Sequence, residues 1–127
     1  MDSSGVLDIL VVDDSPIIVR KLSMLLDAAG YRVVGTAANG KEAITIIDSF
    51  HANIDLLLTD VIMPEMNGRQ LADIFQSKRP GKKVIFMSGY TDDALGQHHM
   101  LDEGIIFIEK PLSPSKLSYK IREVLDN

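Results

Sequence analysis

The chain has 127 residues, 46% of them hydrophobic, which is enough for the core of a single domain. Its formal net charge is −5 and it has no long basic run, which argues against direct nucleic-acid binding. Cysteine is absent, which excludes disulfides and thiolate metal sites, and no apolar run is long enough for membrane insertion. We expect a cytoplasmic protein in which residues 1–5 are a flexible lead-in and residues 6–127 form the domain.

Short apolar runs and amphipathic segments alternate in the first half of the chain. Residues 7–12 are rich in branched side chains, which predicts a strand buried on both faces, and residues 31–34 predict a second strand. Between them, Ser15 as cap and Pro16 at the first position predict the start of a helix that ends at Gly30. A second helix follows the turn residues 39–40 and ends near Phe50.

The same alternation continues to the end of the chain. Residues 56–59, 84–87 and 105–108 predict three more short strands. A third helix follows Gly68 and is broken at Pro80, and a weak fourth helix spans residues 92–101. A last helix begins at Ser113 and Pro114, which repeat the cap-plus-proline start.

Five successive βα units predict an α/β fold with a parallel sheet covered on both faces by helices. Five units are too few to close an eight-stranded barrel, so we expect an open, doubly wound sheet. Ligands of such sheets lie beyond the carboxyl ends of the strands. Polar residues occupy those strand ends here: Asp13, Asp14, Asp60, Ser88 and Lys110.

Each of these residues alone has an ordinary structural explanation, such as a helix cap or a solvated surface charge. Together they form a cluster whose charges must be balanced, because two carboxylates 4 Å apart repel by roughly 4 kcal/mol at an effective dielectric near 20. A divalent cation and one lysine would balance three carboxylates, and oxygen ligands in a water-accessible site favour Mg²⁺. A carboxylate can itself become an aspartyl phosphate. This chemistry predicts a Mg²⁺-dependent acyl-phosphate site without selecting which aspartate is phosphorylated.

Four runs resemble the receiver domains of two-component response regulators: residues 11–15 (VVDDS), 59–68 (TDVIMPEMNG), 87–90 (MSGY) and 109–111 (EKP). Their order and spacing match over nearly the whole chain. The resemblance implies a flavodoxin-like (βα)5 sandwich with strand order 2-1-3-4-5. The run from residue 87 to 93 also resembles receivers attached to hybrid histidine kinases.

The resemblance assigns a role to each site residue. It implies that Asp60 is the phospho-acceptor, that Asp14 binds Mg²⁺ (or Mn²⁺) directly and that Asp13 acts through a bound water. The resemblance also implies that the backbone carbonyl of Ile62 is the remaining protein ligand. The resemblance further implies that the Ser88 hydroxyl and Lys110 bind the phosphoryl group and that the Phe107 side chain moves inward on activation. Tyr90 and Pro111 would lie on the rim of the site, with a cis peptide bond before Pro111.

The resemblance also implies the partners. The donor would be a phosphohistidine on a histidine kinase or a histidine phosphotransfer domain, and the output a downstream protein or a fused output domain. The output surface would combine the fourth helix, the fifth strand and the fifth helix. The consecutive apolar residues Ile17, Ile18 and Val19 either pack locally or dock the donor, and Val19→Glu tests docking. Tyr90 and Ile62 would shield the phosphate from water, and replacing Ile62 by Asn tests that effect.

Three other classes of protein are relevant. A flavodoxin-type FMN carrier is rejected, because Asp13 and Asp14 would repel a flavin phosphate. An aspartate-nucleophile phosphohydrolase would have a second Asp where this chain has Ile62. A receiver that acts as a pure binding module stays open, as does the choice between a stand-alone receiver and part of a longer chain. We expect no enzymatic activity beyond the domain's own phosphorylation and dephosphorylation.

Overall fold

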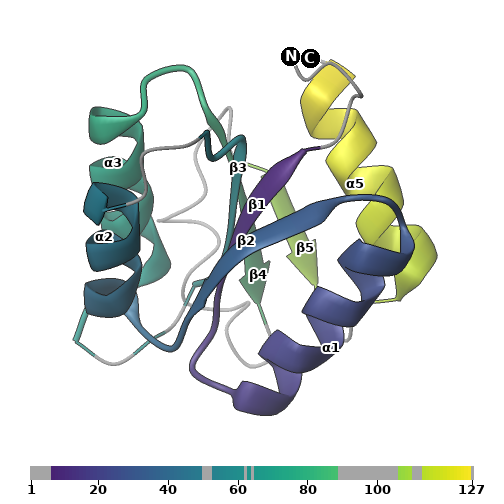
Figure 1. The fold of residues 1–127 in the computed structure, drawn as a ribbon, viewed down its shortest axis with the longest axis horizontal. Helices are drawn as coiled ribbons and strands as arrows, with labels where there is room; N and C mark the ends of the chain where they lie inside the picture. Colours follow the sequence, from purple (N-terminus) through teal and green to yellow (C-terminus); the bar gives the residue numbers. More distant parts are fainter. Residues whose placement is uncertain are drawn as a thin grey trace.

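The computed structural model describes residues 7–49, 53–61, 63, 65–88, 106–109 and 113–126 (Figure 1). Five strands form one parallel sheet in the order β2-β1-β3-β4-β5. The strands are β1 (Asp8–Val12), β2 (Arg32–Ala37), β3 (Leu56–Asp60), β4 (Lys83–Ser88) and β5 (Ile106–Glu109). The described helices are α1 (Pro16–Ala28), α2 (Gly40–Ser49), α3 (Gly68–Lys78) and α5 (Pro114–Asp126). The predicted fold class and strand order are confirmed.

Helices cover both faces of the sheet, α1 and α5 on one side and α2 and α3 on the other (Figure 1). Alternate residues of β1 show why: Ile9 and Val11 pack in the cluster beneath α1 and α5, and Leu10 and Val12 in the cluster beneath α2 and α3. Because side chains alternate across a strand, a strand buried on both faces is apolar over most of its length. The uninterrupted apolar run in β1 therefore follows from its central place in the sheet.

Most predicted boundaries lie within one or two residues of the observed ones, and one strand was predicted too short. The strand predicted over residues 31–34 continues to Ala37, because Gly35 and Thr36, which are not typical strand residues, still pair with β1. The helix predicted over residues 92–101 and the lead-in over residues 1–5 lie outside the described residues.

The edge strand β2 contains an irregularity. Ile9 pairs with Val33 and the next residue of β1, Leu10, pairs with Gly35, so Val34 is an extra residue in β2. Gly35 packs closely against its neighbours: a Cβ at this position would be 3.3 Å from Leu10 Cδ1 and 3.4 Å from Ile46 Cγ2. The bulge and the close packing therefore occur together at the middle of β2.

Charged residues tie the strands together at the amino edge of the sheet. Arg32 Nε donates to Asp8 Oδ1 at 2.6 Å, and the Asp8 N–H donates to Asp55 Oδ2 at 2.9 Å. The hydrogen bond to Asp8, followed by the charge of Asp8, raises the pKa of Arg32 above its ordinary value. While Asp8 carries its charge, the stability contributed by the Arg32 shift is therefore complete below the ordinary pKa of arginine and is lost only as pH rises past the raised value.

Among the described helices, none combines the length and the apolar character that a membrane-spanning segment needs.

Candidate functional site

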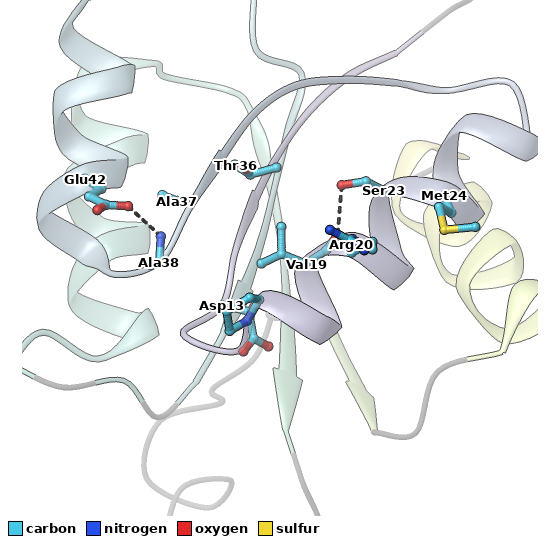
Figure 2. Close-up of a pocket in the computed structure, with 10 residues that line it drawn as sticks. Asp13, Val19, Arg20, Ser23, Met24, Thr36, Ala37, Ala38 and Glu42 are labelled. Carbon is cyan, nitrogen blue, oxygen red and sulfur yellow. Dashed lines mark hydrogen bonds between the residues drawn. The ribbon is translucent and has the colours of Figure 1, made fainter.

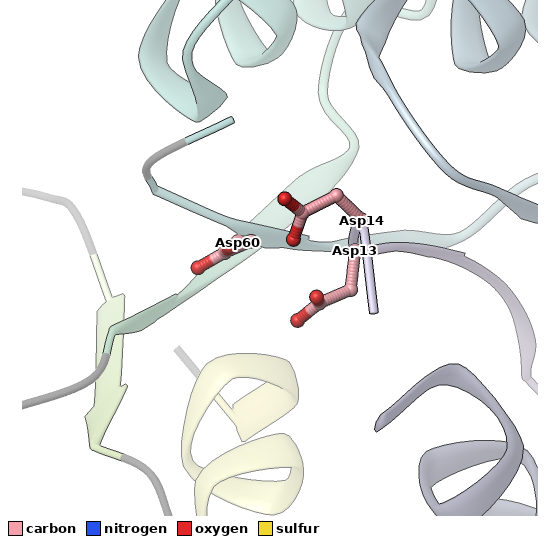
Figure 3. Close-up of side chains that lie close together, drawn as sticks. All are labelled: Asp13, Asp14 and Asp60. Carbon is pink, nitrogen blue, oxygen red and sulfur yellow. The ribbon is translucent and has the colours of Figure 1, made fainter. Parts of the chain in front are cut away.

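Three aspartates meet at the carboxyl edge of the sheet (Figure 3). Asp13 and Asp14 follow β1, and Asp60 is the last residue of the neighbouring strand β3. One carboxylate oxygen from each residue lies within 4.8 Å of the others. Asp13 is 1% exposed and Asp60 5%, whereas Asp14 is exposed to solvent. The cluster therefore has a buried floor and one side open to water.

Backbone hydrogen bonds hold the two buried aspartates in place. The Asp13 N–H donates to the Ala37 carbonyl at 3.1 Å, and Asp13 Oδ1 accepts the Ser15 N–H at 2.9 Å. Asp60 pairs with Met87 of β4, and the N–H of Val61 donates to the Met87 carbonyl at 2.9 Å. The sheet and the start of α1 therefore determine where these carboxylates sit.

The donor set of this cluster suits a hard divalent cation. Its ligands are carboxylate oxygens, which Mg²⁺ and Ca²⁺ prefer over nitrogen or sulfur ligands. Three like charges within 4.8 Å of one another repel strongly when two of them are shielded from water. A bound cation would relieve that repulsion, and the exposed side at Asp14 leaves room for waters that complete its coordination.

Glu65, in the loop after Asp60, has a strained backbone. Glu65 has φ of 69°, in the left-handed region that is costly for residues with a Cβ, and its side chain is exposed. We expect Glu65→Gly to raise the free energy of unfolding by about 0.5–1 kcal/mol. Glycine removes the strain of the left-handed conformation, but part of that gain is offset because glycine has more conformational entropy in the unfolded chain. Urea denaturation measures the change.

Alanine at the same position provides the matched control. Glu65→Ala removes the same charged side chain but keeps the Cβ, so the strain remains and stability should change little. Equal stabilisation by glycine and alanine would contradict the strain explanation and would point to the side chain instead.

The first residues of α3 are fixed by a helix cap and by a hydrogen bond to the loop after Asp60. Asn67 caps α3, accepting the Gln70 N–H at 2.8 Å, while the Gln70 side chain accepts the Asn67 N–H at 3.0 Å. Gly68 donates its N–H to the Val61 carbonyl at 2.8 Å. The third helix was predicted only to follow Gly68, and the reciprocal cap was missed. Its signal, Asn followed three residues later by Gln, was present in the sequence.

An open groove lies beside Asp13, between α1 and the segment that joins β2 to α2 (Figure 2). Its volume is about 500 Å³, and Val19, Arg20 and Met24 form part of the α1 side. Val19 and Ile18 are only partly exposed and pack against the core, whereas Ile17 is 78% exposed. Local packing therefore accounts for Ile18 and Val19, and only Ile17 of these three presents a large exposed apolar surface.

Residues 9–122 match the family of response regulator receiver domains. The chain belongs to this family. Receiver domains are the phosphoryl-accepting modules of two-component signal transduction systems, and the predicted family and function are thereby confirmed.

The receiver domain is similar to proteins of different overall length. It is 34% identical to the sensor kinase CckA of Brucella abortus over 98% of this chain, but it spans only 13% of that kinase. It is 33% identical to the chemotaxis protein CheY of Thermotoga maritima, covering 91% of this chain and 95% of that protein. A crystal structure of a CheX–CheY–BeF3–Mg²⁺ complex from Borrelia burgdorferi matches with a TM-score of 0.81 and 30% identity, covering 96% of this chain and 92% of that chain.

The structure brings together only part of the set of site residues predicted for this receiver. Asp13, Asp14 and Asp60 are adjacent, as expected. Ser88 ends β4 and Phe107 lies in the neighbouring strand β5, although their side chains are not described. The remaining predicted site residues lie outside the described part of the chain: Ile62, Tyr90, Lys110 and Pro111.

Proposed function

We propose that Asp60 is the residue of this receiver that accepts the phosphoryl group, in a reaction that requires Mg²⁺ (or Mn²⁺). The observation that carries the proposal is the carboxylate cluster, in which Asp60 ends a central strand with two further acids within 4.8 Å. Asp13, Asp14, Asp60 and the Ile62 carbonyl would hold the ion. The related CheX–CheY complex from Borrelia burgdorferi contains Mg²⁺, which supports this choice of metal. Residues 6–127 would constitute the domain.

The reaction is an in-line transfer from a phosphohistidine. A carboxylate oxygen of Asp60 attacks phosphorus, the P–O bond forms, the P–N bond breaks, and the imidazole nitrogen leaves with the bonding electron pair. Mg²⁺, when bound, would offset the negative charge gathered between the carboxylates and the phosphoryl oxygens. The Asp60 backbone is held by its pairing with β4, so the carboxylate is oriented before the donor arrives.

The other predicted residues would carry the signal. In this proposal Lys110 pairs with the phosphoryl group, the Ser88 hydroxyl turns toward it and Phe107 moves inward, with Tyr90 and Pro111 at the rim. The change would alter the surface formed by residues 92–101, β5 and α5. Ser88 of β4 pairs with Glu109 of β5, which supports the idea that a movement at the end of β4 is passed on to β5. The receiver would catalyse only its own phosphorylation and dephosphorylation.

A histidine kinase or histidine phosphotransfer domain would supply the phosphoryl group, and a downstream protein or fused output domain would receive the signal. Ile17 extends into solvent from the first turn of α1, two residues after the Ser15 cap and close in sequence to Asp14. We expect Ile17→Glu to slow transfer from the cognate phosphohistidine protein about tenfold, because a buried apolar contact would be replaced by a charge. Transfer rates measured with both donor types test this expectation.

Acetyl phosphate is the comparison donor, since it needs no docking surface. Its rate should be unchanged in Ile17→Glu, and Thr45→Glu, a substitution on α2 across the sheet, serves as the matched control. Ile17→Glu is a cleaner test than Val19→Glu, because Val19 packs against the core. Equal slowing with both donors would exclude docking as the cause.

Intact mass after incubation with acetyl phosphate tests the proposed chemistry directly. Wild-type protein should gain about 80 Da, the mass of one phosphoryl group, in the presence of Mg²⁺ and none after chelation. If the folded protein gained no mass from acetyl phosphate or from a histidine phosphotransfer donor, the proposal would be wrong. The domain would then act through binding without phosphorylation.

A further inference from the structure

The first residue of α3 lies directly against the backbone of the acceptor strand. Gly68 is buried, and its N–H donates to the Val61 carbonyl at 2.8 Å. A Cβ at position 68 would overlap the Asp60 carbonyl oxygen and would lie 3.1 Å from Val61 Cα and 3.2 Å from the Asp60 carbonyl carbon. All three atoms belong to the backbone, so no side chain could rotate to make room.

The backbone conformation at this position does not itself require glycine. The described glycines with positive φ are Gly30 and Gly81, and Gly68 is not among them. Alanine would fit the helical conformation and would favour the helix. Glycine is therefore needed at position 68 only because the start of α3 lies so close to the Asp60 backbone.

Neither side of this contact can retreat easily. The reciprocal cap between Asn67 and Gln70 fixes the first turn of α3, and the helix is anchored by Leu71 and Phe75, both fully buried. On the other side, Asp60 ends the central strand β3 and pairs with Met87 of β4. An added methyl group would therefore move the Asp60 carbonyl, and with it the base of the Asp60 side chain.

We propose that Gly68 is a positioning residue for phosphoryl transfer: its missing side chain lets α3 close on the Asp60–Val61 backbone and hold the Asp60 carboxylate in its reactive place. This inference rests on the proposed role of Asp60. In this role Gly68 acts through the backbone of Asp60 and Val61. A displacement of the acceptor by about 1 Å is enough to slow a reaction by up to about a hundredfold.

The test compares Gly68→Ala with Gly40→Ala. Gly40 is also buried at a helix start, but the atoms nearest its new Cβ all belong to the Met66 side chain, with Sδ at 2.5 Å and Cβ and Cγ at 3.0 Å. The thioether can rotate aside, and the two carbons need to shift by only a few tenths of an ångström. Phosphorylation by acetyl phosphate should slow at least about tenfold in Gly68→Ala and by less than about twofold in Gly40→Ala. The ¹³C shift of the Asp60 carbonyl, measured without metal, should change only in Gly68→Ala.

The outcomes separate this inference from the proposed function. Wild-type protein that fails to gain a phosphoryl group overturns the role of Asp60 itself. A wild type that reacts at Asp60, with Gly68→Ala folded and equally fast, overturns only the role of Gly68. If Gly68→Ala does not fold, Asn67→Ala provides the test, because it loosens the cap of α3. It should slow phosphorylation about threefold and shift the ¹³C signal of the Asp60 carbonyl. If neither the rate nor the signal changes, the inference is overturned.

Discussion

Replacing Asp60 by asparagine should abolish the mass gain from acetyl phosphate. An amide oxygen is a poor nucleophile and cannot form the acyl phosphate. Loss of the nucleophile alone therefore explains complete loss of phosphorylation. Asparagine has nearly the same shape as aspartate, and the position is 5% exposed at the end of β3, so the strand should keep its pairing with β4. Intact mass and circular dichroism measure the two results.

Asp27→Asn is the control for this substitution. Asp27 is an exposed residue near the end of α1, and its replacement changes the net charge by the same amount. It should leave the mass gain intact. A phosphorylated Asp60→Asn protein would show that another group, such as Asp13 or Asp14, accepts the phosphoryl group, and peptide mapping would locate it.

Replacing Asp14 by asparagine should weaken Mg²⁺ binding at least about tenfold, because the variant loses a charged ligand from a cluster of three. Asp14 is exposed, so the fold should tolerate the change, and the metal-free protein should be as stable as wild type or more stable by up to about 1 kcal/mol. Isothermal titration calorimetry measures the affinity, and chemical denaturation measures the stability.

Stability in the presence of the ion gives a second measure of the same effect. At a Mg²⁺ concentration 100 times the wild-type dissociation constant, wild type should gain about 2.7 kcal/mol, and a variant with tenfold weaker binding about 1.4 kcal/mol. Asp27→Asn should follow wild type. Identical Mg²⁺ stabilisation of Asp14→Asn and wild type would place the ion elsewhere.

The sequence predicted the fold well because its strands are buried on both faces. Residues such as Leu56, Leu57 and Leu58 are fully buried, so the apolar run shows directly where the strand lies. The edge strand was less clear, since β2 includes Gly35 and the exposed Thr36. Strand order came from the family resemblance, because periodicity indicates which residues are buried but not which strands are neighbours.

The aspartate cluster could also be predicted from the sequence, because it depends only on where the strands end. Asp13, Asp14 and Asp60 immediately follow or end strands, and parallel strands finish at one edge, so their proximity follows from topology. The closeness of Gly68 to the Asp60 backbone had no such local signal. It depends on how far α3 approaches β3, which is set by packing between segments that the sequence does not show side by side.

The extra residue Val34 has a consequence for how two copies of the molecule meet. A straight outer strand presents a regular row of unpaired amide and carbonyl groups, onto which another strand can add. The two-for-one mismatch opposite Ile9 and Leu10 bends that row and breaks its spacing. β2 is therefore a poor template for strand addition, and the bulge protects the molecule against aggregation along this side of the sheet.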